Sequence, residues 1–272
     1  MSKQFPILAG VPQGSILAPL FYIYFIRNIP TPITQEILSS FYADDVCYAA
    51  SDTEHKKRKN FVSGYLQPIL TDLESFCKKW RIKLNPDKTH CMNFFINKSN
   101  DNTPRLWLKG ELLKYQKEFK FLGYTFDQEL SHKAHINDIV QRSKKRLNLL
   151  KALRGKTWGT NPNTILYTYK AYIRPILEYG SILFAYSDES LLKKIQAVET
   201  SAIKIAFQLP PWTTNHWCYS HVNFDKITNR IKQNAKHFLT KQANDELIKP
   251  LIENAKPSDI GKHSSMFKNL NW

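Results

Sequence analysis

A pair of adjacent carboxylates inside an apolar, β-favouring stretch constrains this chain more than any other feature. The tetrapeptide Tyr42-Ala43-Asp44-Asp45 lies between aromatic and β-favouring residues on both sides, which predicts a strand, a tight turn and a second strand. Two like charges held together in a half-buried hairpin cost free energy unless a cation neutralises them. Mg²⁺ is the natural candidate, because proteins hold it through one or two carboxylates together with water and substrate phosphates. The alternative is a solvent-facing Asp-Asp turn without a metal.

A glycine-rich loop precedes this pair by about thirty residues. In the stretch 10–20, Gly10, Pro12 and Gly14 predict a shaped loop in which the backbone can approach a ligand closely. The apolar run that follows has Pro19 near its start, which favours a buried helix over residues 16–27.

Two further blocks follow the carboxylates. Residues 84–89, with the sequence Leu-Asn-Pro-Asp-Lys-Thr, close a segment with helical periodicity. Residues 119–124, with the sequence Phe-Lys-Phe-Leu-Gly-Tyr, form a strand-like run that ends in a turn. Together with the glycine-rich loop and the carboxylate pair, they make an ordered series of four blocks.

In this order and spacing, the four blocks resemble those of reverse transcriptases from non-LTR retrotransposons, particularly the jockey-like elements of animals. The block Gly-Val-Pro-Gln-Gly-Ser at 10–15 looks like polymerase motif B, and Tyr-Ala-Asp-Asp at 42–45 looks like motif C. Residues 84–89 look like motif D, and Phe-Leu-Gly-Tyr at 121–124 looks like motif E. The helical segment that contains Glu178-Tyr179-Gly180 resembles the thumb region of the same family.

The resemblance implies roles for the first two motifs. Asp44 would be the carboxylate that bridges two Mg²⁺ ions, with Mn²⁺ as a possible substitute, and Asp45 would be its less stringent neighbour. Pro12, Gln13 and Gly14 would touch the incoming nucleotide and the template base. The implied partners are an RNA template, a DNA primer and deoxynucleoside triphosphates.

The resemblance also implies roles for the last two motifs. Lys88 would act as a general acid toward the departing pyrophosphate, although an exposed turn lysine without a catalytic role explains the same residue equally well. Phe121, Leu122 and Gly123 would form the hairpin that grips the primer strand.

One expected part of the catalytic centre has no counterpart in the sequence. The family places a further metal-binding aspartate in motif A, upstream of motif B, but only nine residues precede Gly10 and the first acidic residue is Glu36. Neither Asp127 nor Asp225 lies in a convincing permuted motif A. We therefore expect motif A and the fingers to be absent, and the chain by itself to lack detectable polymerase activity.

Charge is distributed unevenly along the chain. The net charge is +16; residues 1–130 hold 17 basic and 13 acidic residues, and residues 131–272 hold 22 and 10. The positive excess in the second half favours contact with a polyanion. Solvated basic helices or attraction to anionic lipid would explain the charge alone.

The pattern of elements predicts an α+β fold in two parts. Residues 1–130 would form a partial reverse-transcriptase palm, an antiparallel sheet with helices, and residues 131–272 a mainly helical, basic thumb or connection region. The expected elements are helices over 16–27, 55–81, 135–153, 164–177 and 191–209, a hairpin at 40–50, and strands at 92–96 and 105–108.

Two functional hypotheses follow. In the first, the chain is part of an RNA-directed DNA polymerase; in the second, it is a non-catalytic remnant of a retroelement that binds nucleic acid. Four cysteines without paired spacing and the lack of a long apolar run predict an intracellular protein outside the membrane, in the nucleus or the cytoplasm by family resemblance.

Overall fold

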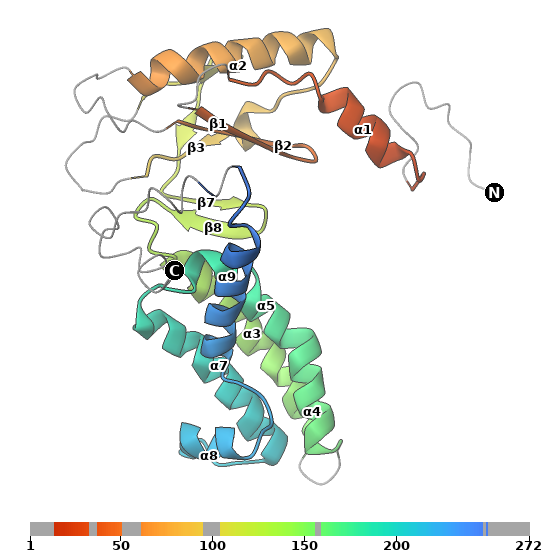
Figure 1. Ribbon diagram of the computed structural model, residues 1–272, viewed down its shortest axis with the longest axis vertical. Helices are drawn as coiled ribbons and strands as arrows, with labels where there is room; N and C mark the ends of the chain where they lie inside the picture. The colour runs from red at the N-terminus through yellow and green to blue at the C-terminus, as the bar shows by residue number, and fades with distance from the viewer. Residues whose placement is uncertain are drawn as a thin grey trace. The chain divides into compact units, whose positions relative to one another are not determined.

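The computed structural model describes residues 14–32, 37–50, 61–94, 104–155, 159–246 and 249. These residues divide into two compact units, which are described separately (Figure 1). The first unit holds the described residues up to Asn93 and those from 104 to Gln116; the second holds Phe94 and the residues from Lys117 onward. Helices and small, mostly antiparallel sheets make up both units, so the predicted α+β class is confirmed.

A helix and a hairpin begin the first unit. Helix α1 spans Ala18–Ile26 with a proline in its first turn, a position that needs no amide donor. Strands β1 (Ile37–Tyr42) and β2 (Asp45–Ala50) pair antiparallel from Ile37 opposite Ala50 to Tyr42 opposite Asp45. Both elements fall where the sequence predicted a helix and a hairpin, although β1 begins three residues early.

Helix α2 (Phe61–Lys79) supplies the core of this unit. Its apolar residues recur at steps of three and four, which places them on one face. Leu73, Phe76 and Cys77 are buried together, and Tyr48 of β2 packs against them. The helix was predicted over 55–81, and residues 55–60 of that range lie outside the described residues.

Short strands complete the first unit. The 3₁₀ turn η1 spans Pro86–Lys88, and the strands are β3 (His90–Cys91), β4 (Trp107–Leu108), β5 (Glu111–Leu112) and β6 (Lys114–Tyr115). β4 pairs antiparallel with β5, and β3 pairs parallel with β6.

The strand predicted at 92–96 is wrong in its described part. Residues 92–94 belong to no strand, and pairing stops at Cys91. Its partner β6 is only two residues long, and the Gln116 amide closes the pairing by donating to the Cys91 carbonyl at 2.9 Å. Without a longer partner strand, the apolar residues after Cys91 have no ladder to join.

The second unit opens with a hairpin and continues as helices. Its elements are β7 (Glu118–Phe121), β8 (Tyr124–Asp127), α3 (Lys133–Arg154), α4 (Pro162–Thr168), the π turn η2 (Tyr169–Ile173), α5 (Arg174–Glu178), α6 (Ser181–Phe184), α7 (Glu189–Phe207), α8 (Asn215–Ser220) and α9 (Ile227–Lys241). The helical character predicted after residue 131 agrees with these elements. The β7–β8 hairpin, however, belongs to this unit, although its residues were predicted as part of the first domain.

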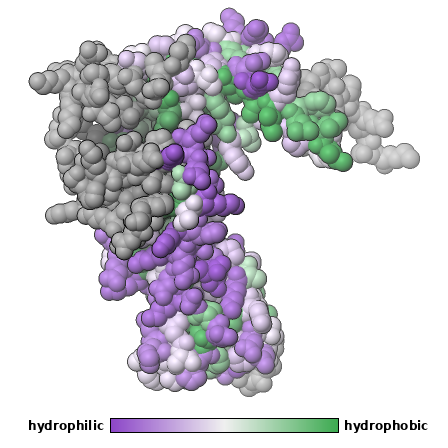
Figure 2. All heavy atoms as spheres, viewed as in Figure 1, coloured by the Kyte–Doolittle hydropathy of each residue, from purple (hydrophilic) through white to green (hydrophobic). Residues whose placement is uncertain are grey.

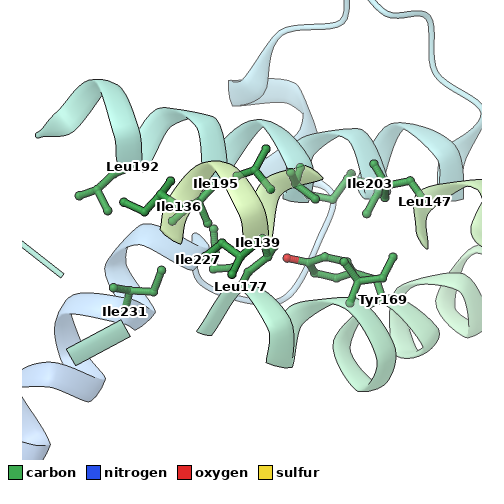
Figure 3. Close-up of a cluster of buried hydrophobic side chains, with 14 of the residues drawn as sticks. Ile136, Ile139, Leu147, Tyr169, Leu177, Leu192, Ile195, Ile203, Ile227 and Ile231 are labelled. Carbon is green, nitrogen blue, oxygen red and sulfur yellow. The ribbon is translucent and has the colours of Figure 1, made fainter. Parts of the chain in front are cut away.

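Aliphatic side chains from several helices form the core of the second unit (Figure 3). The side chains with no exposed surface include Ile136, Ile139, Leu150, Ile165, Ile173, Leu177, Ile195, Ile203, Ile227 and Ile231. Each such side chain contributes about 1.5–3 kcal/mol of burial free energy. This cluster is therefore the main source of stability for the helical unit.

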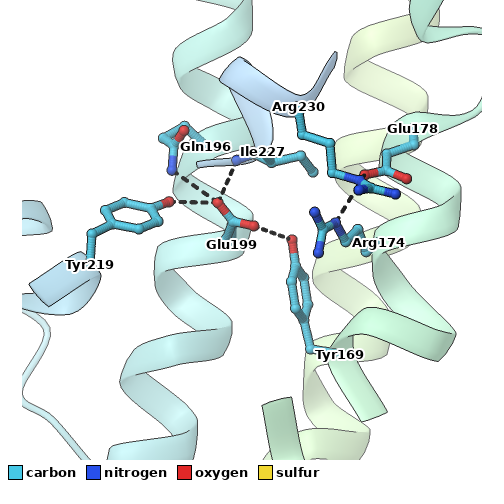
Figure 4. A network of polar contacts seen from close by, with 8 residues as sticks. All are labelled: Tyr169, Arg174, Glu178, Gln196, Glu199, Tyr219, Ile227 and Arg230. Carbon is cyan, nitrogen blue, oxygen red and sulfur yellow. Dashed lines mark hydrogen bonds and ion pairs between the residues drawn. The ribbon is translucent and has the colours of Figure 1, made fainter. Parts of the chain in front are cut away.

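A buried carboxylate ties four segments of this core together (Figure 4). Glu199 of α7 has no exposed surface. It accepts hydrogen bonds from the Tyr219 hydroxyl at 2.7 Å, the Ile227 amide at 2.8 Å, the Tyr169 hydroxyl at 3.2 Å and the Gln196 amide at 3.3 Å. Burial raises the pKa of Glu199 above its usual value, and the hydrogen bonds oppose that shift.

A second charged group lies beside this carboxylate. Glu178 accepts from the Nε atoms of both Arg174, at 2.9 Å, and Arg230 of α9. The arrangement links the end of α5 to α9. None of the described helices is both long and apolar enough to cross a bilayer.

Candidate functional site

The two adjacent carboxylates lie at the exposed tip of the β1–β2 hairpin. Ala43 and Asp44 form the two-residue turn, and Asp45 begins β2 opposite Tyr42. Ala43 has a φ of +51°, a left-handed conformation that costs a residue with a Cβ about 1–2 kcal/mol. Strain of this kind is found preferentially at functional positions of a chain.

The hairpin has one packed face and one open face. Cross-strand partners share a face, and Tyr48 marks the packed one: its hydroxyl donates to the Pro30 carbonyl at 2.7 Å, and burial raises its pKa to about 12. Asp45 lies on the opposite face with Tyr42, whose side chain is 64% exposed. The carboxylates are therefore open to solvent, and the strands behind them are anchored.

Helix α1 holds the turn from the side. The Tyr22 hydroxyl donates to the Ala43 carbonyl at 3.1 Å, so the helix that follows the first block contacts the carboxylate turn directly. An open groove of about 740 Å³ runs between α1 and the hairpin. Its lining is mostly apolar: Leu20, Ile23, Tyr24, Ile26, Arg27, Ile29, Thr31, Phe41, Tyr42 and Ala43.

The expectation that this helix is buried is wrong. Only Ala18 of α1 is buried, whereas Leu20, Ile23 and Tyr24 are more than half exposed. Figure 2 shows the hydrophobic side chains that gather on the surface of α1. The helix is apolar on every side, and within the described residues it packs through one side only, including an edge-on contact of Phe25 with Trp80 at 5.3 Å.

The donor set at the hairpin tip suits a hard divalent cation. Asp44 and Asp45 are exposed, and no hydrogen bond or ion pair among the described residues occupies their carboxylates. No group of three or more His, Cys, Asp or Glu side chains in the described ranges could hold a metal. Two carboxylates alone match the requirement of an ion such as Mg²⁺, which keeps waters and takes other ligands from a substrate.

Lys88 occupies a separate position in the first unit. It is exposed on η1, whose first turn is fixed by the Asn85 side chain accepting from the Asp87 amide at 3.0 Å. Within the described part of the chain, no hydrogen bond or ion pair brings Lys88 to Asp44. Its catalytic role stays a prediction.

Of the nucleotide-binding residues predicted in the first block, only one can be placed. Pro12 and Gln13 lie outside the described residues. Gly14 has a φ of +85° with open space around it, which agrees with the shaped loop that its sequence predicts.

The predicted primer grip forms the turn of the β7–β8 hairpin. Leu122 and Gly123 both have positive φ, +46° and +82°, and Phe121 pairs with Tyr124 across the turn. Two consecutive positive φ values define the hairpin turn whose twist matches that of the flanking strands. Leu122 projects at the tip with 36% of its surface exposed.

Two histidines at the start of the α3 segment, His132 and His135, contact this hairpin. The Tyr124 hydroxyl contacts His132 Nδ1 at 2.8 Å, and the Tyr124 ring stacks on His135 at 3.9 Å. Burial lowers the pKa of both histidines. The charged groups that act on His135 are Arg142 and Asp138 of its own helix and His132.

Sequence reasoning did not find these supporting residues. His132 and His135 stand in the stretch Ser-His-Lys-Ala-His at 131–135, where two histidines precede a helical pattern without any recognisable spacing. Glu178-Tyr179-Gly180 was predicted only as a feature of the thumb region, whereas in the structure the Tyr179 hydroxyl donates to the Leu122 carbonyl in the β7–β8 turn.

Comparison with known proteins shows which class of protein the chain resembles. Residues 1–126 match the family described as reverse transcriptase (RNA-dependent DNA polymerase). The chain is therefore related to reverse transcriptases over the part that holds the carboxylate hairpin and most of the β7–β8 hairpin. No solved structure matches the chain.

Individual relatives extend the similarity beyond residue 126. The chain is 29% identical to the RNA-directed DNA polymerase from mobile element jockey of Drosophila melanogaster, over 86% of this chain and 26% of that protein. It is 26% identical to the probable RNA-directed DNA polymerase from transposon BS of the same species, over 85% and 26%. For the probable polymerase from transposon X-element the identity is 25%, over 88% and 26%. The predicted resemblance to non-LTR, jockey-like retrotransposon reverse transcriptases is confirmed, and the chain spans about a quarter of these relatives.

Proposed function

We propose that this chain forms part of an RNA-directed DNA polymerase of a non-LTR retrotransposon, with Asp44 and Asp45 as its metal-binding carboxylates. The observation that carries the proposal is the position of the pair. Both carboxylates stand exposed at the tip of a two-residue hairpin turn, and none of the ion pairs among the described residues involves them; the hairpin lies within the part of the chain that matches the reverse transcriptase family.

The chain's own residues would prepare this site for the metal and the substrate. The left-handed Ala43 and the Tyr22 hydroxyl bond fix the turn, so both carboxylates face solvent without rearrangement. Mg²⁺, when bound, supplies activation of the primer hydroxyl and stabilisation of the departing pyrophosphate. Lys88 would donate a proton to that leaving group, and the Leu122–Gly123 turn would contact the primer strand.

Metal binding can be tested without polymerase activity. Titration of the protein with Mn²⁺, followed by the paramagnetic relaxation enhancement of water, should give a site that Mg²⁺ displaces. Asp44→Asn should weaken that site at least tenfold. The matched control is Asp87→Asn, an exposed carboxylate on η1 that should leave it unchanged. Equal Mn²⁺ affinity in the Asp44 variant and the parent protein would refute the assignment.

We further propose that this chain by itself does not extend a primer. The resemblance to reverse transcriptases implies a further metal-binding aspartate beside this pair, and the described residues form no group of three or more metal-binding side chains. Primer extension on a homopolymer RNA template with Mg²⁺ or Mn²⁺ tests this expectation. Template-dependent extension that Asp44→Ala abolishes would show that the chain is a complete enzyme.

A second candidate function is nucleic-acid binding without catalysis. Helix α9 buries Ile227, Ile231 and Ala235 on one face, and its exposed face carries basic side chains and no acidic one: Arg230, Lys232, Lys236 and Lys241. A polyanion would be attracted to this face by counterion release. Replacing Lys232 and Lys236 with alanine should lower the slope of log K against log salt by about 2 in fluorescence anisotropy with a labelled duplex. An unchanged slope would place the binding surface elsewhere.

A further inference from the structure

The β7–β8 turn is held by a residue that lies far from it in the sequence. Tyr179, at the end of α5, donates its hydroxyl hydrogen to the Leu122 carbonyl, 57 positions away. The hydroxyl end of its ring packs against Gly123, where an added Cβ would stand 3.2 Å from both Cε1 and Oη. Gly123 therefore serves two needs at once, a positive φ and a surface on which the tyrosine can rest.

A second tyrosine and glycine repeat this contact in the opposite direction. Gly180 follows Tyr179 and has a φ of +67°. An added Cβ at Gly180 would stand 2.5 Å from Cδ2 of Tyr124, the residue that follows Gly123. Tyr179 thus covers Gly123, the neighbour of Tyr124, and Tyr124 covers Gly180, the neighbour of Tyr179. The turn and the Tyr179–Gly180 segment therefore pack against each other at two points.

One imidazole connects the backbones of the two segments. His135 Nδ1 lies 3.3 Å from the Thr125 amide, and His135 Nε2 lies 3.3 Å from the Tyr179 carbonyl. A neutral imidazole with its hydrogen on Nε2 satisfies both, because it accepts at Nδ1 and donates at Nε2. His135 is fully buried, so water does not compete for either bond.

We propose that Tyr179 is a positioning residue that fixes the Leu122–Gly123 turn for contact with a primed nucleic-acid strand. The inference rests on the proposed primer-grip role of that turn. Tyr179 keeps half of its surface exposed although its hydroxyl is bound, so it reaches the turn from the outside and does not serve the buried core. Its hydroxyl also donates to the Leu122 carbonyl. The partly exposed Leu122 side chain is therefore the part of the turn that can contact another molecule.

Tyr179→Phe in the full chain is the decisive variant, because it removes the hydroxyl and keeps the ring. Hydrogen exchange of the Gly123 and Thr125 amides in the free protein reports the rigidity of the turn. Fluorescence anisotropy reports the affinity for an RNA template annealed to a recessed DNA primer and for the same RNA without a primer. Tyr167→Phe is the matched control, since Tyr167 is an exposed tyrosine of α4 whose hydroxyl takes part in none of the hydrogen bonds of the described residues.

We expect Tyr179→Phe to speed exchange at both amides and to weaken binding of the primed template about threefold to tenfold. Binding of the unprimed RNA and the melting temperature should stay as in the parent, and the control should change nothing. Unchanged exchange, faster exchange with unchanged primed affinity, or an equal loss for primed and unprimed RNA would each overturn the inference. A parent protein that does not prefer primed template would overturn the primer-grip function itself, and the inference with it.

Discussion

Glu199 offers a direct test of how the helical unit is held together. Replacing it with alanine leaves the Ile227 amide and the Tyr169 hydroxyl without their acceptor, and both residues are fully buried. Each buried donor left unpaired costs about 1–3 kcal/mol. Release of a carboxylate whose pKa burial has raised offsets part of this cost. We expect Glu199→Ala to lower the free energy of unfolding by about 3 kcal/mol.

Urea denaturation at neutral pH, followed by circular dichroism, measures this loss. The control is Glu189→Ala at the exposed start of the same helix, which should change stability by about 0.5 kcal/mol through the helix dipole. If Glu199→Ala cost no more than the control, the network in Figure 4 would not stabilise the unit.

The pH dependence provides a second check on the same carboxyl group. Its pKa is higher in the folded protein than in the unfolded chain, so its contribution to stability is complete below the usual carboxyl pKa and declines as pH rises through the raised value. Glu199→Gln keeps the shape and cannot ionise. The parent should therefore lose stability relative to this variant as pH rises from about 4.5 through the raised value. A constant difference across that range would contradict the buried, pKa-shifted state.

Three further predictions concern the two hairpins. Ala43→Gly should relieve the left-handed strain at the carboxylate turn and raise the urea midpoint, with a net gain of about 0.5 kcal/mol after the entropy of glycine is allowed for; a loss of stability would show that the strain is absent. Gly180→Ala should destabilise by at least about 2 kcal/mol more than Gly110→Ala, because both glycines have positive φ but only the Gly180 position is filled by a ring at 2.5 Å; equal melting temperatures would contradict the packing. The pKa of His135 is lowered in the folded protein, so the stability that its neutral form gives is present above its usual pKa and is lost as pH falls through the lowered value. On acidification the free energy of unfolding of the parent should therefore fall relative to that of His135→Gln. Parallel pH profiles of the two proteins would contradict this prediction.

The local elements were largely predictable from the sequence. The carboxylate hairpin follows from β-favouring residues on both sides of Tyr42-Ala43-Asp44-Asp45, and the second hairpin turn from the glycine in Phe-Leu-Gly-Tyr. These signals are local, because a turn depends on a few neighbouring residues. Long amphipathic helices such as α3 and α7 were predictable for the same reason.

Features that depend on distant partners were not predictable. The exposure of α1 depends on what packs against it. An apolar helix has the same sequence pattern whether it is buried or exposed. The length of β3 depends on β6, which lies more than twenty residues later. The contact of Tyr179 with the turn joins two segments that share no sequence pattern, so only packing reveals it. The roles of Asp44, Asp45 and Lys88 stay predictions.

The division between the two units falls at residues 116–117, before the β7–β8 hairpin, whereas the family match continues to residue 126. The chain should therefore be cut for separate production ahead of Lys117. A fragment that begins at residue 131 would lose Tyr124 and Phe126, and so leave His135 and Gly180 without their aromatic cover. A fragment that begins at Lys117 keeps this cover and should be the more soluble and protease-resistant of the two.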